Sequence, residues 1–374
     1  LPEEHLLQLT GCTIRTHSTL RHGLLAFPRT APHQPLGPVL AVSKDVTTIT
    51  LPSEIAREPL RFTTHTVLHL NRTVETMLAI PRGEYVVADA VMLASTKPIE
   101  GFVRFDKDFT RLLATLVVPQ ATLVSEDTRA EVCGVIGMAS TLPGPRNIPL
   151  GTYTMALKSL AVTRKDEPGI FLTNIQMGSA TEVSNGLLHT MQTVTVDAID
   201  VAGAIYGPVV LHTAVRNLDA DALARLQTLA KNAQRNSARG ANSAAAIGVL
   251  MASLPEVLTQ FLQASPCIEF QNWSAGTPHG TFTLRGMLAA STDAPINAFA
   301  FLNIGSLLKL INADLTVALP QAFVDNVVLP HAGQMPLDVT TLLVKSATHY
   351  TSHIVFNDGV LTVNGTPMPL PGLD

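Results

Sequence analysis

Apolar and polar residues alternate in short segments through much of the first half of the chain, which is the pattern of half-buried β-strands. No segment of helical period lies between these segments, and Gly, Pro, Asn or Asp residues separate most of them. Successive strands without intervening helices predict antiparallel hairpins and meanders rather than alternating β and α units. The segments, rich in Val, Leu, Ile and Thr, are Leu60–Leu70, Glu84–Ser95, Glu131–Ser140, Gly151–Val162 and Gly207–Leu218.

The pattern changes to a helical period in the middle of the chain. Asp219 is placed to cap a helix N-terminus, and Leu218 and Leu223 stand at the two positions of a hydrophobic staple. The same helix face continues through Leu226, Leu229 and Ala230. A short polar link leads to a second apolar segment, Ala244–Ala264, which ends before Pro266. These features predict two helices that form an antiparallel hairpin packed on a sheet.

Strand patterns return after the second predicted helix. Cys267–Ala275 and His279–Ala290 are predicted to pair, with the turn within Gly276–Gly280. Asn297–Ile311 has a helical pattern, and Ala313–Pro320 has a strand pattern.

The C-terminal stretch holds two tight-turn signals, Asp358-Gly359 and Asn364-Gly365. Two-residue loops at both sites keep the apolar side chains on one side of the hairpins. The pairs that these loops imply are Phe356 with Leu361, Ile354 with Val363, Val363 with Thr366, and Leu361 with Met368. Pro367 and Pro369 then lie where the N–H of any other residue would point away from the hairpin. The sequence therefore predicts a three-stranded closing meander with an edge blunted by proline.

Together these elements predict an α+β protein that is predominantly antiparallel β, with curved sheets and a helical hairpin in the second half. Two regions are expected. The first, residues 1–216, is a β-rich N-terminal lobe. The second, residues 217–374, holds the helical hairpin and a mixed α/β lobe that ends in the meander.

The composition adds an excess of apolar residues to this picture. Of the 374 residues, 46% are apolar and only 14% are charged, against roughly 25% charged in an average globular domain. Three interpretations stay open: a large ordinary core, an apolar groove that holds a lipid or acyl chain, and an apolar surface for a protein partner or a second copy. The net charge of −4 and the lack of a Lys/Arg-rich segment argue against a nucleic-acid partner.

Residues with metal-binding or redox chemistry are sparse. Cys12, Cys133 and Cys267 are widely spaced and form no C-x-x-C motif, which argues against a zinc or thioredoxin-type site. We interpret them as small apolar residues, with one disulfide as the alternative in an oxidising compartment. His65 and His69 lie four positions apart. On a strand their side chains would be roughly 13 Å apart, too far to share one metal ion.

Ser352, His353 and Asp358 are the residue types of a catalytic triad. Ser352 and His353 are adjacent on a predicted strand, however, so their side chains point to opposite faces. The sequence contains neither the G-x-S-x-G turn of a serine hydrolase nor a G-K-[ST] phosphate loop. It therefore predicts no catalytic, cofactor-binding or metal-binding residue, and no cofactor.

Three segments of the second half resemble hallmarks of the YdgA-like family of bacterial envelope proteins: Tyr206–Leu226, Ser265–Gly286 and His349–Gly365. They contain a G-P strand that runs into an NLD helix start, a T-P-x-G turn, and a closing DG-x-L-x-VNG hairpin. The resemblance implies a membrane anchor upstream of Leu1 and a body in the periplasm. It implies no catalytic residues, because the family is defined by an uncharacterised domain.

The function expected is therefore that of a non-catalytic, periplasmic cell-envelope protein, tethered to the inner membrane, that binds a protein partner or an apolar ligand such as a lipid. The alternative is a periplasmic hydrolase whose catalytic residues the sequence does not reveal. A homodimer also stays open as a use of the apolar surface.

Overall fold

The computed structural model of the chain describes residues 13–22, 39–50, 60–87, 91–95, 97–108, 110–125, 127–238, 256–290, 309–330 and 342–368. Every strand register that it defines is antiparallel, which confirms the predominantly antiparallel β prediction. The chain divides into two compact units. Unit 1 holds residues 1–142, 151–177 and 196–205, and unit 2 holds residues 143–150, 178–195 and 206–374.

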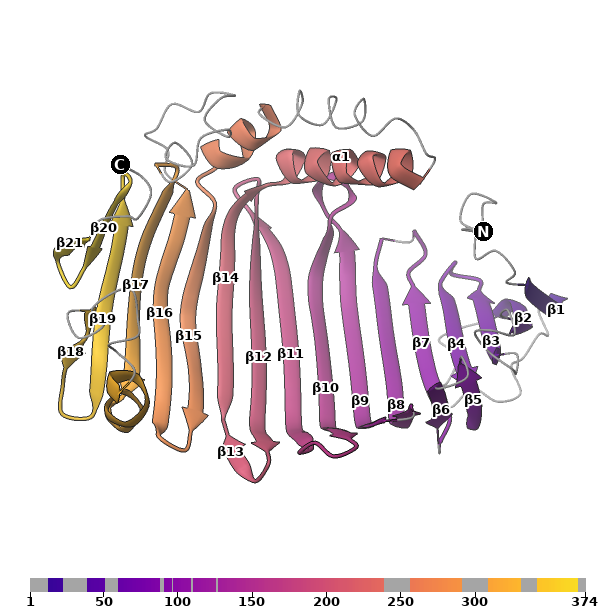
Figure 1. The fold of residues 1–374 in the computed structure, drawn as a ribbon. Coiled ribbons are helices and arrows are strands. Elements are labelled where there is room, and N and C mark those ends of the chain that lie inside the picture. The colour runs from indigo at the N-terminus through magenta and orange to yellow at the C-terminus, as the bar shows by residue number, and fades with distance from the viewer. Residues whose placement is uncertain are drawn as a thin grey trace. The chain divides into compact units, whose positions relative to one another are not determined.

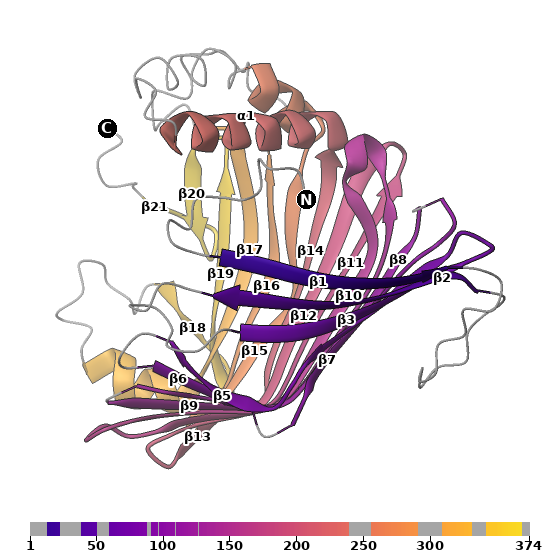
Figure 2. The same ribbon diagram turned by 90° about the vertical axis from the view of Figure 1, so that its right-hand side faces the viewer.

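Unit 1 is built mainly from the first nine strands. Their hydrogen-bonded order is β1–β2–β3–β4–β7–β8–β9, and β5 and β6 form a hairpin that pairs with β8 through β6. Figure 2 shows β1, β2 and β3 lying side by side. The bounds are β1 (Thr13–His22), β2 (Val39–Thr50), β3 (Leu60–His69), β4 (Val74–Ile80), β5 (Gly83–Val87), β6 (Val91–Ser95), β7 (Ile99–Phe105), β8 (Leu112–Val124) and β9 (Thr128–Pro143).

The single strand predicted over Glu84–Ser95 is wrong, because β5 and β6 are two antiparallel strands there. The reversal occurs inside an apolar run in which Asp89 is the only turn-forming residue, so the sequence pattern does not mark the turn.

Pro119 lies in the middle of β8, although proline has no N–H to donate to a neighbouring strand. On β8, the partner β7 reaches Val117 and the partner β6 begins at Thr122, so the residue without an N–H lies in the gap between them.

Three long strands contribute residues to both units: β10 (Pro149–Arg164), β11 (Ile170–Ser184) and β12 (Leu187–Val201). A 3₁₀ turn, η2 (Pro145–Asn147), precedes β10, and the short β13 (Ala204–Tyr206) follows β12.

Unit 2 contains the remaining strands. The order β14–β15–β16–β17–β19–β20–β21 runs without a break, and β18 pairs with the end of β19. Figure 1 shows β14 to β19 as a row of neighbouring strands. The bounds are β14 (Val209–Asp219), β15 (Cys267–Thr277), β16 (Gly280–Ala290), β17 (Ile311–Pro320), β18 (Val344–Lys345), β19 (His349–Asn357), β20 (Val360–Val363) and β21 (Thr366–Met368).

The predicted helix start is confirmed at α1 (Ala220–Ala238). The Asp219 carboxylate accepts a hydrogen bond from the Ala222 N–H at 2.7 Å, which satisfies one of the free donors of the first turn. Leu218 and Leu223, the two staple residues, both pack on a small core. That core consists of Ile148, Leu188 and Ala220, with Leu150 half-buried against it.

The helical hairpin is confirmed only in part. Residues 256–263 are helical, and the rest of the predicted helix Ala244–Ala264 lies outside the described residues except for Ala264, which is in a turn. Arg225 of α1 forms an ion pair with Glu256 at 3.2 Å, so the two helices do lie against each other. Most of the helix predicted over Asn297–Ile311 also lies outside the described residues. Its last residue, Ile311, begins β17 instead.

The predicted C-terminal meander is confirmed in its register. Phe356 pairs with Leu361 and Ile354 with Val363 across the first loop, and Val363 pairs with Thr366 across the second. Pro367 stands opposite Thr362 in β21, and β21 pairs only with β20 among the described strands. Pro367 therefore lies in an edge strand, where its missing N–H breaks no ladder. Pro369 lies outside the described residues.

Candidate ligand-binding face

One face of the unit 2 sheet is almost entirely apolar across six strands. Side chains alternate along each strand, so every second residue of a strand points to the same side of the sheet. The registers of β14, β15, β16, β17, β19 and β20 show which of these residues lie on one common side. We call this surface, on β14, β15, β16, β17, β19 and β20, the apolar face; none of its described members on these six strands is charged. Its members are Val209, Leu211, Thr213, Val215, Ile268, Phe270, Trp273, Ala275, Thr277, Gly280, Phe282, Leu284, Gly286, Leu288, Ala290, Ile311, Ala313, Leu315, Val317, Leu319, Tyr350, Ser352, Ile354, Phe356, Leu361 and Val363. At its edge Lys345 of β18 stands opposite Tyr350, with its Nζ 5.3 Å from the centre of the Tyr350 ring.

A β-bulge on β15 brings two aromatic rings onto this face. The register slips between Phe270 and Trp273, so both side chains point the same way although they lie three positions apart. Their rings meet edge to face, with centroids 4.8 Å apart. The Trp273 indole N–H donates to the Thr213 hydroxyl at 2.9 Å, which satisfies its one polar group within the apolar surroundings.

A cleft of about 290 Å³ opens on the apolar face. The side chains of the apolar face that line it are Leu211, Trp273, Ala275, Phe282, Leu284, Val317 and Leu319. Each of these side chains is half-buried rather than buried, so the cleft has apolar walls that solvent reaches. Such walls with few polar groups are typical of small-molecule sites.

Gly286 lies on the same face, opposite Phe270 on β15 and Leu315 on β17. Its φ is +135°, and a Cβ at this position would lie 2.0 Å from the carbonyl oxygen of Asp314. Only glycine fits this backbone. The face therefore lacks a side chain next to the bulge, between two large apolar neighbours.

A short helical segment covers one end of the apolar face. It consists of α4 (Gln321–Phe323) and the π-helical turn η4 (Val324–Val328). The Phe323 ring packs edge to face on Phe282, with centroids 4.7 Å apart. The Tyr350 hydroxyl donates to the Asp325 carboxylate at 2.7 Å, and this bond is the main reason why the pKa of Asp325 lies below its usual range.

The opposite face of the same strands is polar. Arg216 and Glu269 form an ion pair at 2.8 Å, and His353 lies 2.9 Å from Asp314. The two faces of this sheet therefore differ: one carries ion pairs, and the other carries mainly aliphatic and aromatic side chains.

The register separates the triad candidates. Ser352 stands opposite Val317 on the apolar face, whereas His353 stands opposite Thr316 on the polar face. Asp358 lies in the turn after β19. Ser352 and His353 therefore cannot act together as nucleophile and base, as the sequence predicted.

The histidine pair of unit 1 behaves as a structural feature. His65 and His69 share a face of β3, and His69 is 1% exposed. Its Nε2 lies 3.3 Å from the Glu75 carboxylate, without hydrogen-bond geometry. The described part of the chain contains no group of three or more His, Cys, Asp or Glu placed to hold a metal ion.

The two described cysteines, Cys133 and Cys267, are free thiols and half-buried. Burial raises the pKa of the Cys267 thiol, which makes it a poor nucleophile. Cys12 lies outside the described residues.

Other clefts in unit 2 have charged and polar groups in their lining beside apolar ones. One of about 500 Å³ lies between α1 and the helix at residues 256–263. Its main groups are already paired with each other: Arg146 Nε lies 2.7 Å from Asp221, and Arg225 lies 3.2 Å from Glu256. These pairs account for the charges of that cleft, so the apolar face is the stronger candidate site.

The chain belongs to the family described as bacterial protein of unknown function (DUF945), whose match spans residues 6–371. No curated protein and no solved structure matches the chain. Among the residues that the structure describes, no helix is both long and apolar enough to cross a membrane.

Proposed function

We propose that the chain is a non-catalytic protein that binds an apolar ligand, of the class of lipid acyl chains, on the apolar face of unit 2. The observation that carries this proposal is the uncharged cleft of about 290 Å³ with solvent-accessible apolar walls. Side chains that only closed a protein core would be buried. Here Leu211, Leu284 and Val317 keep part of their surface exposed.

The chemistry of the face favours an acyl chain over a polar ligand. A polar ligand needs hydrogen-bond partners, because a buried polar group without one is costly. The hydroxyl-bearing side chains of this face are Thr213, Thr277, Ser352 and Tyr350. Three of these are already engaged, Thr213 by Trp273, Thr277 by the Gly280 carbonyl and Tyr350 by Asp325. An acyl chain needs no such partners, and each CH₂ that it buries contributes about 0.8 kcal/mol.

The experiment is native mass spectrometry and lipid extraction of protein purified without detergent, in wild type and in two matched variants. Leu284→Gln places a polar amide in the cleft. Arg285→Gln places the same side chain on the neighbouring residue, which is exposed on the polar face. Far-UV circular dichroism establishes that each variant keeps its β structure.

We expect co-purified lipid with wild type and Arg285→Gln, and strongly reduced lipid with Leu284→Gln. Absence of lipid from all three folded proteins, together with no uptake of added fatty acid, would contradict the proposal. A wild-type dimer that Leu284→Gln converts to monomer would instead assign the face to self-association.

The cellular setting is a second part of the proposal. We propose that the protein works in the bacterial envelope on the periplasmic side, in line with the YdgA-like resemblance of residues 207–365. Fractionation of cells that produce the full-length native protein is the check. Recovery in the soluble cytoplasmic fraction would contradict this part and leave the ligand proposal standing.

A further inference from the structure

The first three strands of unit 1 bring scattered cations onto one face. The registers align Arg15 with Thr48 and Arg61, and Thr19 with Lys44 and His65. Strand alternation then places seven basic side chains on the same side, of which His69 is buried. The other six form what we call the basic face: Arg15, His17, Arg21, Lys44, Arg61 and His65.

The hydrogen bonds of the opposite face confirm this assignment. Thr16 and Thr47 share a hydrogen bond at 3.1 Å, and Thr64 donates to Asp45 at 3.4 Å. Asp45 is the only carboxylate in the described residues of β1 to β3, and it belongs to that opposite face. Hydrogen bonds, of which the one from the Ser18 side chain has the largest effect, keep the pKa of Asp45 below its usual range. The basic face therefore carries no acidic residue on these strands.

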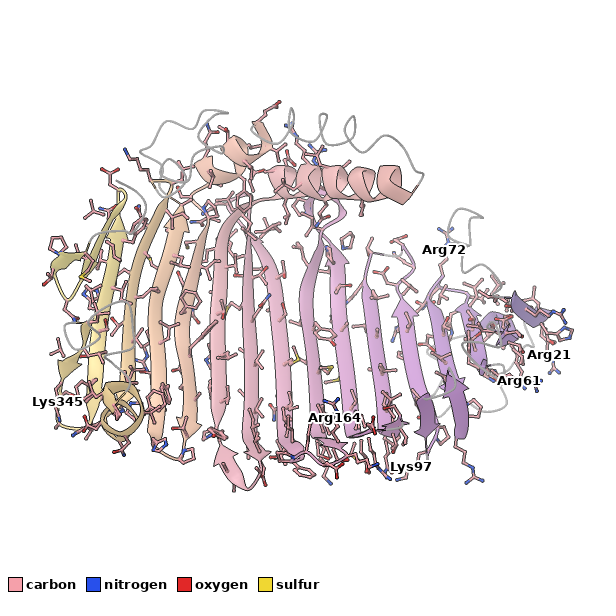
Figure 3. The ribbon with its side chains drawn as sticks, in the orientation of Figure 1. Arg21, Arg61, Arg72, Lys97, Arg164 and Lys345 are labelled. Carbon is pink, nitrogen blue, oxygen red and sulfur yellow. The ribbon has the colours of Figure 1, made fainter. Side chains whose placement is uncertain are left out.

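The cations are also available to a partner. All side chains of β1 from Ile14 to Arg21 are exposed, and so are Lys44 and Arg61. Among the described residues of the neighbouring strand β4, the carboxylate on the same side of the sheet is that of Glu75, which lies beside His69 and Arg104. Figure 3 shows Arg21 and Arg61 at the same edge of unit 1, with Lys97 and Arg164 away from them.

We infer that the basic face docks on the phosphate headgroups of an anionic lipid bilayer. Three of its four permanent cations are arginines, whose planar guanidinium groups match phosphate oxygens. The face spans ~20 Å along β1 and ~10 Å across three strands, which suits a flat array of headgroups. Val42 and Val46 lie between the cations, as at membrane interfaces where aliphatic groups accompany Lys and Arg.

A phosphate backbone of nucleic acid is the less favoured partner. Proteins that bind single strands stack bases on aromatic side chains. The described residues of the basic face include no Phe, Tyr or Trp, because Phe62 belongs to the opposite face. The inference is independent of the ligand proposal, since it concerns different residues in the other unit.

The test is sedimentation of the full chain with vesicles of phosphatidylcholine alone, and of phosphatidylcholine with about one third phosphatidylglycerol. The variant carries Arg15→Gln, Arg21→Gln, Lys44→Gln and Arg61→Gln. The control removes four exposed cations elsewhere in unit 1, by the changes Lys97→Gln, Lys107→Gln, Arg164→Gln and Lys165→Gln. Thermal unfolding monitors whether β1 to β3 stay folded.

We expect wild type and the control to bind only the anionic vesicles, and the binding to disappear at high salt. Each cation at an anionic surface raises the affinity for the membrane about fivefold. The quadruple variant should therefore bind the vesicles at least about 100-fold more weakly. Equal weakening by the control variant would show a net-charge effect and overturn the inference. Binding to duplex DNA but not to anionic vesicles would also overturn it.

If the quadruple variant is unfolded, the single change Arg21→Gln on the exposed edge strand β1 replaces it. We then expect about fivefold weaker binding to the anionic vesicles, and unchanged binding would contradict the inference.

Discussion

The hydrogen bond between Trp273 and Thr213 offers a sharp test of the apolar face. Thr213→Val keeps the shape and the β-branched side chain but removes the acceptor of the indole N–H, which now lies at 2.9 Å. A hydrogen bond contributes about 1 kcal/mol net, and leaving a buried donor unsatisfied costs about 1–3 kcal/mol. Because Trp273 is half-buried and water reaches part of the site, we expect a loss of about 1 kcal/mol in the free energy of unfolding.

Urea unfolding followed by far-UV circular dichroism measures this loss. With a slope of about 3 kcal/mol per M, the midpoint should fall by about 0.3 M. Thr316→Val, an exposed position on the polar face of β17, is the matched control and should change the free energy by less than about 0.5 kcal/mol. A double-mutant cycle with Trp273→Phe should give a coupling of about 1 kcal/mol. Effects that add within about 0.3 kcal/mol would refute the hydrogen bond and the geometry at the bulge.

Three further predictions concern the fold of unit 2. Leu188→Ala should lower the free energy of unfolding by about 2–5 kcal/mol, since Leu188 is 1% exposed; a loss below about 1 kcal/mol in urea unfolding would contradict its place in the core. Gly286→Ala should cost about 1–3 kcal/mol or more, because its Cβ would meet the Asp314 carbonyl; an unchanged melting temperature would refute this. Asp325, held mainly by Tyr350, has a folded pKa below 3.8, so its stabilisation is present above about pH 3.8 and is lost as pH falls through the folded pKa. The urea midpoint of Asp325→Asn should therefore fall less than that of wild type between about pH 5 and about pH 2, and equal falls would argue against the contact.

The elements that the sequence predicted well are those specified by neighbouring residues. The loop at Asp358-Gly359 combines turn chemistry with an apolar alternation that permits one register, and the structure has that register. Asp219 likewise stands where a strand ends and a helical period begins, and it caps α1. In both cases the local preference and the final fold agree.

The candidate sites depended on long-range register, which a single sequence does not contain. Thr213 and Trp273 lie 60 positions apart, and their contact requires both the β14–β15 pairing and the bulge on β15. The alternation within each strand did indicate which of its residues share an apolar side. It did not indicate which strands pair, and so which apolar sides lie together. The basic face was missed for the same reason, because Arg21, Lys44 and Arg61 form no basic segment in the sequence.

The most direct test of the ligand proposal uses the chain's one tryptophan, which lines the cleft. Trp273 fluorescence is recorded while a fatty acid brominated in mid-chain is added, with the unbrominated acid as the reference. We expect saturable quenching by the brominated acid, weakened by Leu284→Gln and unchanged by Arg285→Gln. Equal fluorescence with the brominated and the unbrominated acid would contradict the assignment of the apolar face as an acyl-chain site.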